Sequence, residues 1–105
     1  MKNDASALDR KRPTQSEFEF LAGELIGEKT SVVKSSSKGF QGLEGKIVDE
    51  TRNTFVLETR RGRKTVPKKE CVFLFPASGV KADGSLLVSR PEDRTKKIAR
   101  LSARR

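Results

Sequence analysis

The stretch GLEGKIVDETRNTFVLET, residues 42–59, decides the fold. It reads as two β-strands, because β-branched and other apolar residues recur on both sides of a polar break. The break falls at Arg52-Asn53, where Asn tolerates the positive φ of a tight turn. Gly42 and Gly45 stand near the start of the first strand and permit a bulge or a sharp bend there. The stretch therefore predicts an antiparallel hairpin in a bent sheet.

Further short strands are expected on both sides of this hairpin. They are placed at 29–35, 64–66, 71–75 and 85–88, with Gly62 as the pivot of the turn 60–63. Five or six short strands within about sixty residues, with glycine bends, are typical of a small antiparallel barrel. The predicted fold class is therefore mainly β, a bent barrel that is closed or nearly closed.

Helices are predicted at both ends of the barrel. Thr14 and Glu17 have the spacing of a capping box, and an apolar stripe at helical spacing follows as far as Gly27. Near the C-terminus, Pro91 and the acids after it suit the first turn of a helix. The expected single domain has four segments: a flexible arm at 1–13, a helix at 14–27, the barrel at 28–90, and a helix with a basic tail at 91–105.

Most of the positive charge lies in two short stretches. The 105 residues carry 23 Lys and Arg against 14 Asp and Glu, a formal net charge of +9. Residues 60–70 hold six bases and one acid, and residues 90–105 hold seven bases and two acids. Two such clusters favour a nucleic acid as partner, because each neutralised phosphate releases counterions. The alternative is a solvated basic surface that only aids solubility.

The composition excludes several classes of protein. The chain has no His and one Cys, so it lacks Ser-His-Asp and Cys-His nucleophile systems, His metal sites and internal disulfides. No apolar run approaches the roughly 18–20 residues that cross a bilayer. The N-terminus lacks the apolar stretch of a signal peptide. We therefore expect a cytoplasmic protein that does not contact a membrane.

The acid pair Asp49-Glu50 is the candidate for a metal or acid–base site. Neighbouring strand residues point to opposite faces, so the two carboxylates are not expected to converge on one ion. We expect a structural pair, with Asp49 accepting backbone N–H groups and Glu50 bound to a base. Cys71 lies in an apolar run, where a buried thiol has a raised pKa and low reactivity.

The phenylalanines are candidates for stacking on bases, as on sheets that bind single strands. Phe55, Phe73 and Phe75 lie in apolar runs and are predicted to be core. Phe40, in a glycine-flanked loop, stays open as a stacking residue. The acidic, apolar-striped helix at 14–27 suits contact with a protein better than contact with RNA.

Four segments together resemble the ribonuclease P protein component 1 family. They are ELIG at 24–27, GLEGKIVDETRNT at 42–54, VPK at 66–68 and RPEDR at 90–94. The resemblance covers about residues 24–97 and implies a strongly bent, Sm-like antiparallel barrel flanked by terminal helices. It also implies a subunit of the archaeal ribonucleoprotein that removes the 5′ leader of precursor tRNA. In that enzyme the RNA subunit, with bound magnesium, performs the cleavage, so no catalytic residue, metal or cofactor is expected on this chain.

The resemblance further implies partners and sites. The expected partners are the ribonuclease P RNA, the zinc-ribbon protein component 4, other ribonuclease P proteins and, indirectly, precursor tRNA. The partner-protein contact is placed on Phe18, Leu21 and Leu25 of the N-terminal helix. Charge and expected exposure assign the RNA backbone to Arg52, Arg60, Arg61, Arg63, Lys64, Lys68, Lys69, Arg90, Arg94, Lys96, Lys97 and Arg100.

Two other functions stay open. A ribosomal or transcription-associated RNA-binding barrel would explain GLEGKIV at 42–48, which looks like the glycine-turn motif of those proteins, but not the VPK and RPE segments. An autonomous nuclease would need carboxylates that converge on a metal, which Asp49 and Glu50 are not expected to do.

Overall fold

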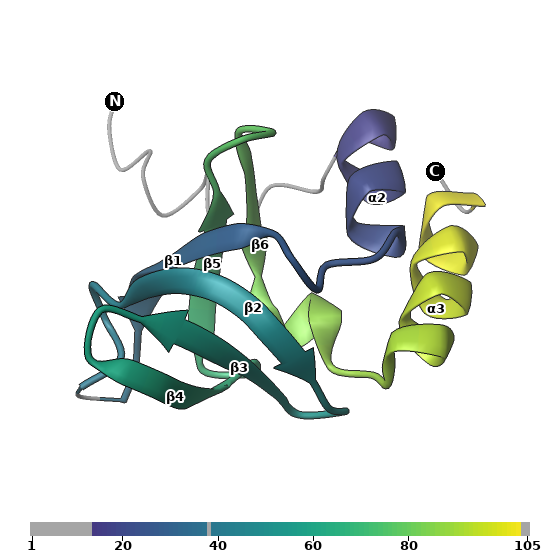
Figure 1. The fold of residues 1–105 in the computed structure, drawn as a ribbon. Helices are drawn as coiled ribbons and strands as arrows, with labels where there is room; N and C mark the ends of the chain where they lie inside the picture. Colours follow the sequence, from purple (N-terminus) through teal and green to yellow (C-terminus); the bar gives the residue numbers. More distant parts are fainter. Residues whose placement is uncertain (1–13, 38, 104–105) are drawn as a thin grey trace.

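The computed structural model describes residues 14–37 and 39–103 (Figure 1). Its main element is one antiparallel sheet. The predicted arm, 1–13, and the end of the predicted tail, 104–105, lie outside the described residues. The strands run across the sheet in the order β4-β3-β2-β1-β5-β6. Their bounds are β1 Lys29–Ser35, β2 Glu44–Glu50, β3 Thr54–Thr59, β4 Gly62–Pro67, β5 Cys71–Phe75 and β6 Val80–Asp83.

The sheet bends along β1 and β2 (Figure 1). The pairing register shifts once between β1 and β5 and once between β2 and β3, and such bulges sharpen the local twist. At Gly45 the backbone of β3 comes so close that a Cβ would lie 2.4 Å from the Glu58 carbonyl oxygen. The predicted bent, mainly β, antiparallel fold is confirmed. In the described part of the chain β4 and β6 are its two edges, so the sheet is open.

The prediction of a strand at 85–88 is wrong. Residues Gly84–Leu87 form a 3-10 helix, η1, and the sixth strand is β6, which pairs with β5. The Asp83 carboxylate accepts the Ser85 N–H at 2.9 Å, and this cap favours a helical turn over an extended strand.

The two α-helices, α2 Gln15–Ala22 and α3 Pro91–Ala103, pack side by side (Figure 1). The predicted capping box is present, with the Thr14 N–H donating to Glu17 Oε1 at 2.9 Å. The helix α2 ends at Ala22 rather than at residue 27, because Gly23 takes an extended backbone and donates its N–H to the Phe20 carbonyl. None of the described helices is long and apolar enough to cross a membrane.

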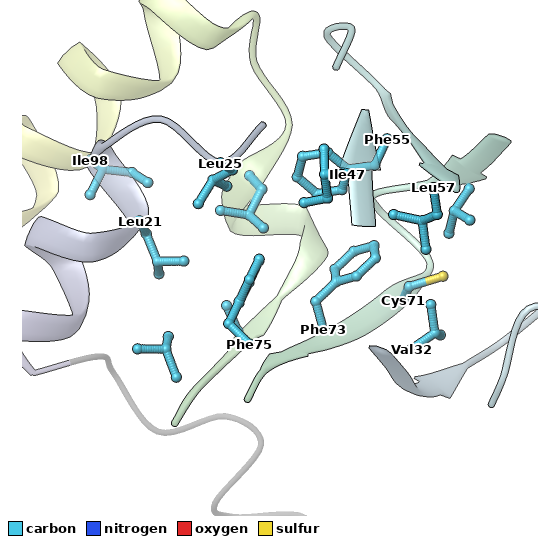
Figure 2. Packing of buried hydrophobic residues seen from close by; sticks show 14 of the residues in the cluster. Leu21, Leu25, Val32, Ile47, Phe55, Leu57, Cys71, Phe73, Phe75 and Ile98 are labelled. Carbon is cyan, nitrogen blue, oxygen red and sulfur yellow. The ribbon is translucent and has the colours of Figure 1, made fainter. Parts of the chain in front are cut away.

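One apolar core joins the helices to the sheet (Figure 2). Leu21 of α2 and Ile98 of α3 form its helical end. Phe55 and Phe73 meet edge to face with centroids 5.3 Å apart, an arrangement that adds about 0.5–1.5 kcal/mol to their burial. With Phe75 also buried, all three phenylalanines predicted to be core are confirmed.

Candidate nucleic-acid interface

Glu50, the last residue of β2, binds two cations inside the protein. The Lys68 ammonium lies 2.9 Å from Glu50 Oε2. Arg94 binds both carboxylate oxygens, with Nε 2.9 Å from Oε2 and Nη2 3.0 Å from Oε1. All three residues are buried. Bidentate, charge-assisted bonds of this kind are among the strong ones, so the Glu50 carboxylate is fully engaged within the fold.

Asp49 faces away from this pairing. It is exposed, and its Oδ1 accepts the Glu50 N–H at 2.9 Å. Both predictions for the acid pair are therefore confirmed, and the two carboxylates do not converge. Within 14–37 and 39–103, no group of three or more His, Cys, Asp or Glu residues is placed to hold a metal ion.

Lys68 also binds two backbone carbonyls. Its ammonium donates to the carbonyl oxygens of Thr51 at 2.8 Å and Ser89 at 2.9 Å. Burial lowers the pKa of the Lys68 ammonium, and the hydrogen bond to Glu50 opposes that shift. The ammonium thus holds the loop after β2 to the segment before α3.

Arg94 adds the end of α2 to the same assembly. Its Nη1 donates to the Gly23 carbonyl at 2.8 Å and to the Leu21 carbonyl. We refer to Glu50, Lys68 and Arg94 as the Glu50 cluster. It holds two cations and one anion, a net charge of +1, and it ties both helices to the sheet.

The burial of Lys68 and Arg94 corrects two of the predicted RNA-binding residues. Their exposed fractions are 0% and 1%, so neither has a free face for a phosphate. Lys97 is half-buried, its ammonium donates to the Val88 carbonyl at 3.2 Å, and burial lowers its pKa. A count of charges along the chain does not distinguish a surface cation from one that binds an internal carboxylate.

The other predicted RNA-binding residues are exposed. They lie in the β2–β3 loop, on the β3–β4 hairpin, in the turn after β4, in the segment before α3 and along α3 itself. They are Arg52, Arg60, Arg61, Arg63, Lys64, Lys69, Arg90, Lys96 and Arg100.

The first concentration of these bases is the tip of the β3–β4 hairpin. Thr59 pairs with Gly62, which leaves Arg60 and Arg61 as a two-residue loop. Gly62 has φ of 101°, as its predicted role of pivot requires. The Thr59 hydroxyl accepts the Arg61 N–H at 3.1 Å. The loop is therefore fixed by its own hydrogen bonds and holds two guanidinium groups at the end of the sheet.

A groove of about 350 Å³ beside the tip adds two bases that the sequence analysis missed. Lys29 and Lys46 line it together with Arg60, and the acids Glu44 and Glu58 line it too. Lys29 and Lys46 face each other across β1 and β2. The register between β1 and β2 brings these two lysines together, and the sequence pattern does not determine that register.

The second concentration is a cleft of about 480 Å³ where the β2–β3 loop meets the segment before α3. It joins Arg52 and Arg90, which the sequence places in different charged segments. Its lining is Glu50, Thr51, Arg52, Asn53, Arg90, Pro91 and Glu92. We call it the Arg52–Arg90 cleft. The length of β3, roughly 17–20 Å for a strand of this size, separates it from the hairpin tip.

The predicted partner-protein residues Phe18, Leu21 and Leu25 are buried in the core of this chain. Their assignment to a protein contact is therefore corrected: the apolar stripe of α2 packs against its own domain. A short helix is marginal alone, and this packing stabilises it. The exposed positions of this segment include Glu19 and Glu24, which are acidic.

Two further predictions concern single side chains. Cys71 is buried, and burial raises the pKa of its thiol, which donates to the Ser35 hydroxyl at 3.5 Å. Both features agree with the prediction of an inert core thiol. Phe40 is partly buried and packs against the core, which leaves less of its ring for stacking on a base.

Together these features define a class of protein. It is a small, bent antiparallel β protein with two concentrations of exposed bases, and the carboxylate at the end of β2 is bound internally. Residues 19–97 match the family described as Ribonuclease P/MRP, subunit p29. The chain belongs to this family, as the resemblance in its sequence predicted.

Two relatives in sequence agree with this assignment. Ribonuclease P protein component 1 of Methanocaldococcus jannaschii is 52% identical over 80 residues, which cover 73% of this chain and 84% of the relative. The protein of the same name from Methanosphaera stadtmanae is 43% identical over 77 residues, covering 70% and 83%. A solved structure of a homologue of the human RNase P protein Rpp29 is 43% identical to this chain. The match covers 69% of this chain and 97% of that structure's chain, with a TM-score of 0.49.

Proposed function

We propose that this chain is a non-catalytic, RNA-binding subunit of ribonuclease P that supports the catalytic RNA in removing the 5′ leader of precursor tRNA. The observation that carries the proposal is the pair of exposed basic sites on a member of this family, the hairpin tip and the Arg52–Arg90 cleft. The proposed RNA contacts are the exposed bases of these two sites, Lys69 in the turn after β4 and the exposed bases of α3, with Lys97 as a partly accessible addition.

The proposed mechanism is charge neutralisation on a rigid frame. Each phosphate that Lys or Arg neutralises releases counterions, which favours binding and reduces repulsion between RNA segments. Two basic sites a strand length apart contact two stretches of backbone, so they favour RNA folds that bring those stretches together. Magnesium and the cleavage step belong to the RNA subunit in this proposal.

The proposed protein partners are the zinc-ribbon component 4 and other ribonuclease P proteins, in the cytoplasm, with precursor tRNA contacted indirectly. We place the component 4 contact on the exposed, acidic side of the α2 segment, around Glu19 and Glu24, since the apolar side is covered by the core. Carboxylates there favour a partner with a basic surface.

The test is precursor-tRNA cleavage by reconstituted ribonuclease P at limiting magnesium, with and without this chain. The zinc-ribbon partner is present in every reaction, and one control omits the catalytic RNA. We expect faster cleavage with the chain, and only when the catalytic RNA is present. Charge neutralisation predicts that the stimulation shrinks as magnesium rises, because magnesium then screens the RNA by itself.

Each other outcome points to a different function. Cleavage without the RNA would identify an autonomous nuclease. Absence of stimulation by folded protein, together with co-purification with ribosomes, would favour a ribosomal or transcription-associated barrel.

A further inference from the structure

The Lys68 ammonium orients two peptide groups at the Arg52–Arg90 cleft. It binds the carbonyl oxygens of Thr51 and Ser89, and the bonds that follow these carbonyls are trans. In a planar trans peptide the N–H points opposite to the C=O. The N–H groups of Arg52 and Arg90 therefore point away from the buried ammonium. Within the described residues neither N–H has a hydrogen-bond partner.

Among the described residues, the side chains of the same two arginines also have no ion-pair partner. Arg52 and Arg90 are exposed, line the cleft and make no ion pair with any other described residue. A guanidinium carries several donors in a planar fork that matches two oxygens of a phosphate. Two side chains and two peptide N–H groups are thus available as donors at one cleft.

The charge around the cleft is positive despite its acids. Glu50 lines it but is neutralised by Lys68 and Arg94, which leaves the Glu50 cluster with a net positive charge below the surface. Glu92 is the other carboxylate in the lining. Buried charges are poorly screened by salt, so the cluster adds to the attraction that Arg52 and Arg90 exert on an anion.

We propose that the Arg52–Arg90 cleft is a binding site for a single phosphodiester group of RNA, held by the guanidinium and peptide N–H groups of both arginines. This inference rests on the proposed function and identifies one anchor within it. A contact of this kind reads no base, so the cleft fixes where the backbone lies and the rest of the RNA sets specificity. The buried Lys68 acts on the site through the peptide groups that it orients and never touches the ligand.

The direct test is an NMR titration of the full-length ¹⁵N-labelled chain with inorganic phosphate and, separately, with ribonuclease P RNA from Methanocaldococcus jannaschii. We expect both probes to shift the amide resonances of Arg52 and Arg90. The Gly79 amide, which donates to the Phe75 carbonyl at 2.8 Å and lies outside both basic sites, is the internal control and should not respond to phosphate. Unmoved Arg52 and Arg90 amides overturn the proposal. A response to phosphate but not to RNA identifies an adventitious ion only and also overturns it.

RNA binding by variants separates this inference from the proposed function. Arg52→Ala and Arg90→Ala should each weaken binding roughly tenfold and lower the log–log salt slope by about one unit. Because both residues contact one phosphate, the double variant should lose about the same slope as either single variant. Glu92→Gln, which removes a carboxylate from the cleft, should tighten binding.

The outcomes remain distinguishable. If Arg61→Ala and Arg63→Ala on the hairpin weaken RNA binding while the cleft variants do not, the inference fails and the proposed function stands. If the unaltered chain binds no RNA, the proposed function fails. If the double variant loses the sum of the slopes that the two single variants lose, the arginines bind two separate phosphates, and the single site is overturned. Circular dichroism of each variant checks that these exposed substitutions leave the fold unchanged.

Discussion

Arg94 holds both carboxylate oxygens of Glu50, with Nε 2.9 Å from Oε2 and Nη2 3.0 Å from Oε1, across 44 residues of chain. The interaction joins the last helix to the central strand β2, and the Arg94 donors to Leu21 and Gly23 extend it to the first helix. The Glu50 cluster therefore determines how the helical end and the sheet meet.

Glu50→Gln should destabilise the protein by roughly 3–5 kcal/mol, because it leaves two buried cations without an anion. Asp49→Asn, one residue away and exposed, is the matched control and should change stability by less than about 0.5 kcal/mol. Urea unfolding followed by circular dichroism measures both. Equal stabilities of the two variants would mean that the cluster contributes little. If Glu50→Gln fails to fold while Asp49→Asn folds, the loss of the buried anion has removed all of the protein's stability, which also confirms the prediction.

Arg61→Ala and Lys69→Ala should weaken RNA binding and flatten its salt dependence by about one log–log unit for each phosphate that the variant no longer neutralises. Arg61→Lys keeps the charge and should keep the slope, which distinguishes charge from shape at the hairpin tip. Filter binding of ribonuclease P RNA over a range of salt concentrations gives the slopes. Unchanged slopes in both alanine variants would place the RNA-binding surface elsewhere.

Leu21→Ala should lower the free energy of unfolding by about 2–5 kcal/mol, because Leu21 is fully buried between α2 and the core. Glu19→Ala, on the exposed side of the same helix, should leave stability nearly unchanged. If Glu19→Ala weakens the complex with the zinc-ribbon partner and not the fold, the acidic side of α2 is the partner contact. A stable Leu21→Ala variant with weakened partner binding would restore the contact to the apolar side.

Gly84→Ala should destabilise the protein by at least about 1–3 kcal/mol, because the new Cβ would lie 1.7 Å from the Lys68 carbonyl oxygen. Gly23→Ala is the control, since the nearest atom to a Cβ there is 3.4 Å away. Thermal unfolding compares the two. Because Gly84 is tight against the backbone of Lys68, the alanine should also disturb the cluster, and coupling with Glu50→Gln in a double-mutant cycle would detect this. Additive effects would mean that the two sites are independent.

Stability should fall above about pH 9 through Cys71. Burial raises the pKa of its thiol from the ordinary 9.0, so the unfolded chain loses the proton at lower pH than the folded one. The contribution is complete below the unfolded pKa and is lost as pH rises through the folded value. Burial lowers the pKa of Lys68 from its ordinary 10.5, so Lys68 makes stability rise with pH below 10.5. Lys68 is present in the unaltered chain and in Cys71→Ala alike, so its contribution cancels when the two are compared. Urea unfolding between about pH 8 and pH 10 should show a steeper loss for the unaltered chain than for Cys71→Ala, and parallel curves would contradict this.

The sequence predicted elements whose signals are local. The capping box at Thr14, the turn at Gly62 and the bend near Gly45 each follow from a few adjacent residues. The prediction of a strand at 85–88 was wrong because its two leucines suit either a strand or a helical turn. The Asp83 carboxylate caps this segment and stabilises the helical turn.

The candidate site was harder to predict because burial depends on contacts between distant segments. The sequence indicated that Glu50 binds a base, but the partners come from the turn after β4 and from α3. Lys68 and Arg94 carry the same charge signal as the exposed Lys69 and Arg90. Only the packed fold separates these two groups, and only the fold brings Arg52 and Arg90 to one cleft.

The bonds from Arg94 to the end of α2 also set an order of events during synthesis. The ribosome makes Gly23 first and Arg94 71 residues later, an interval of several seconds at about 5–20 residues per second. Throughout the later part of that interval the emerging chain already contains Glu50 and Lys68, while the helix that completes their pairing does not yet exist. The contacts of the first helix with the last therefore form only after residue 94 has been made, and the apolar surface that these contacts cover is exposed on the nascent chain until then.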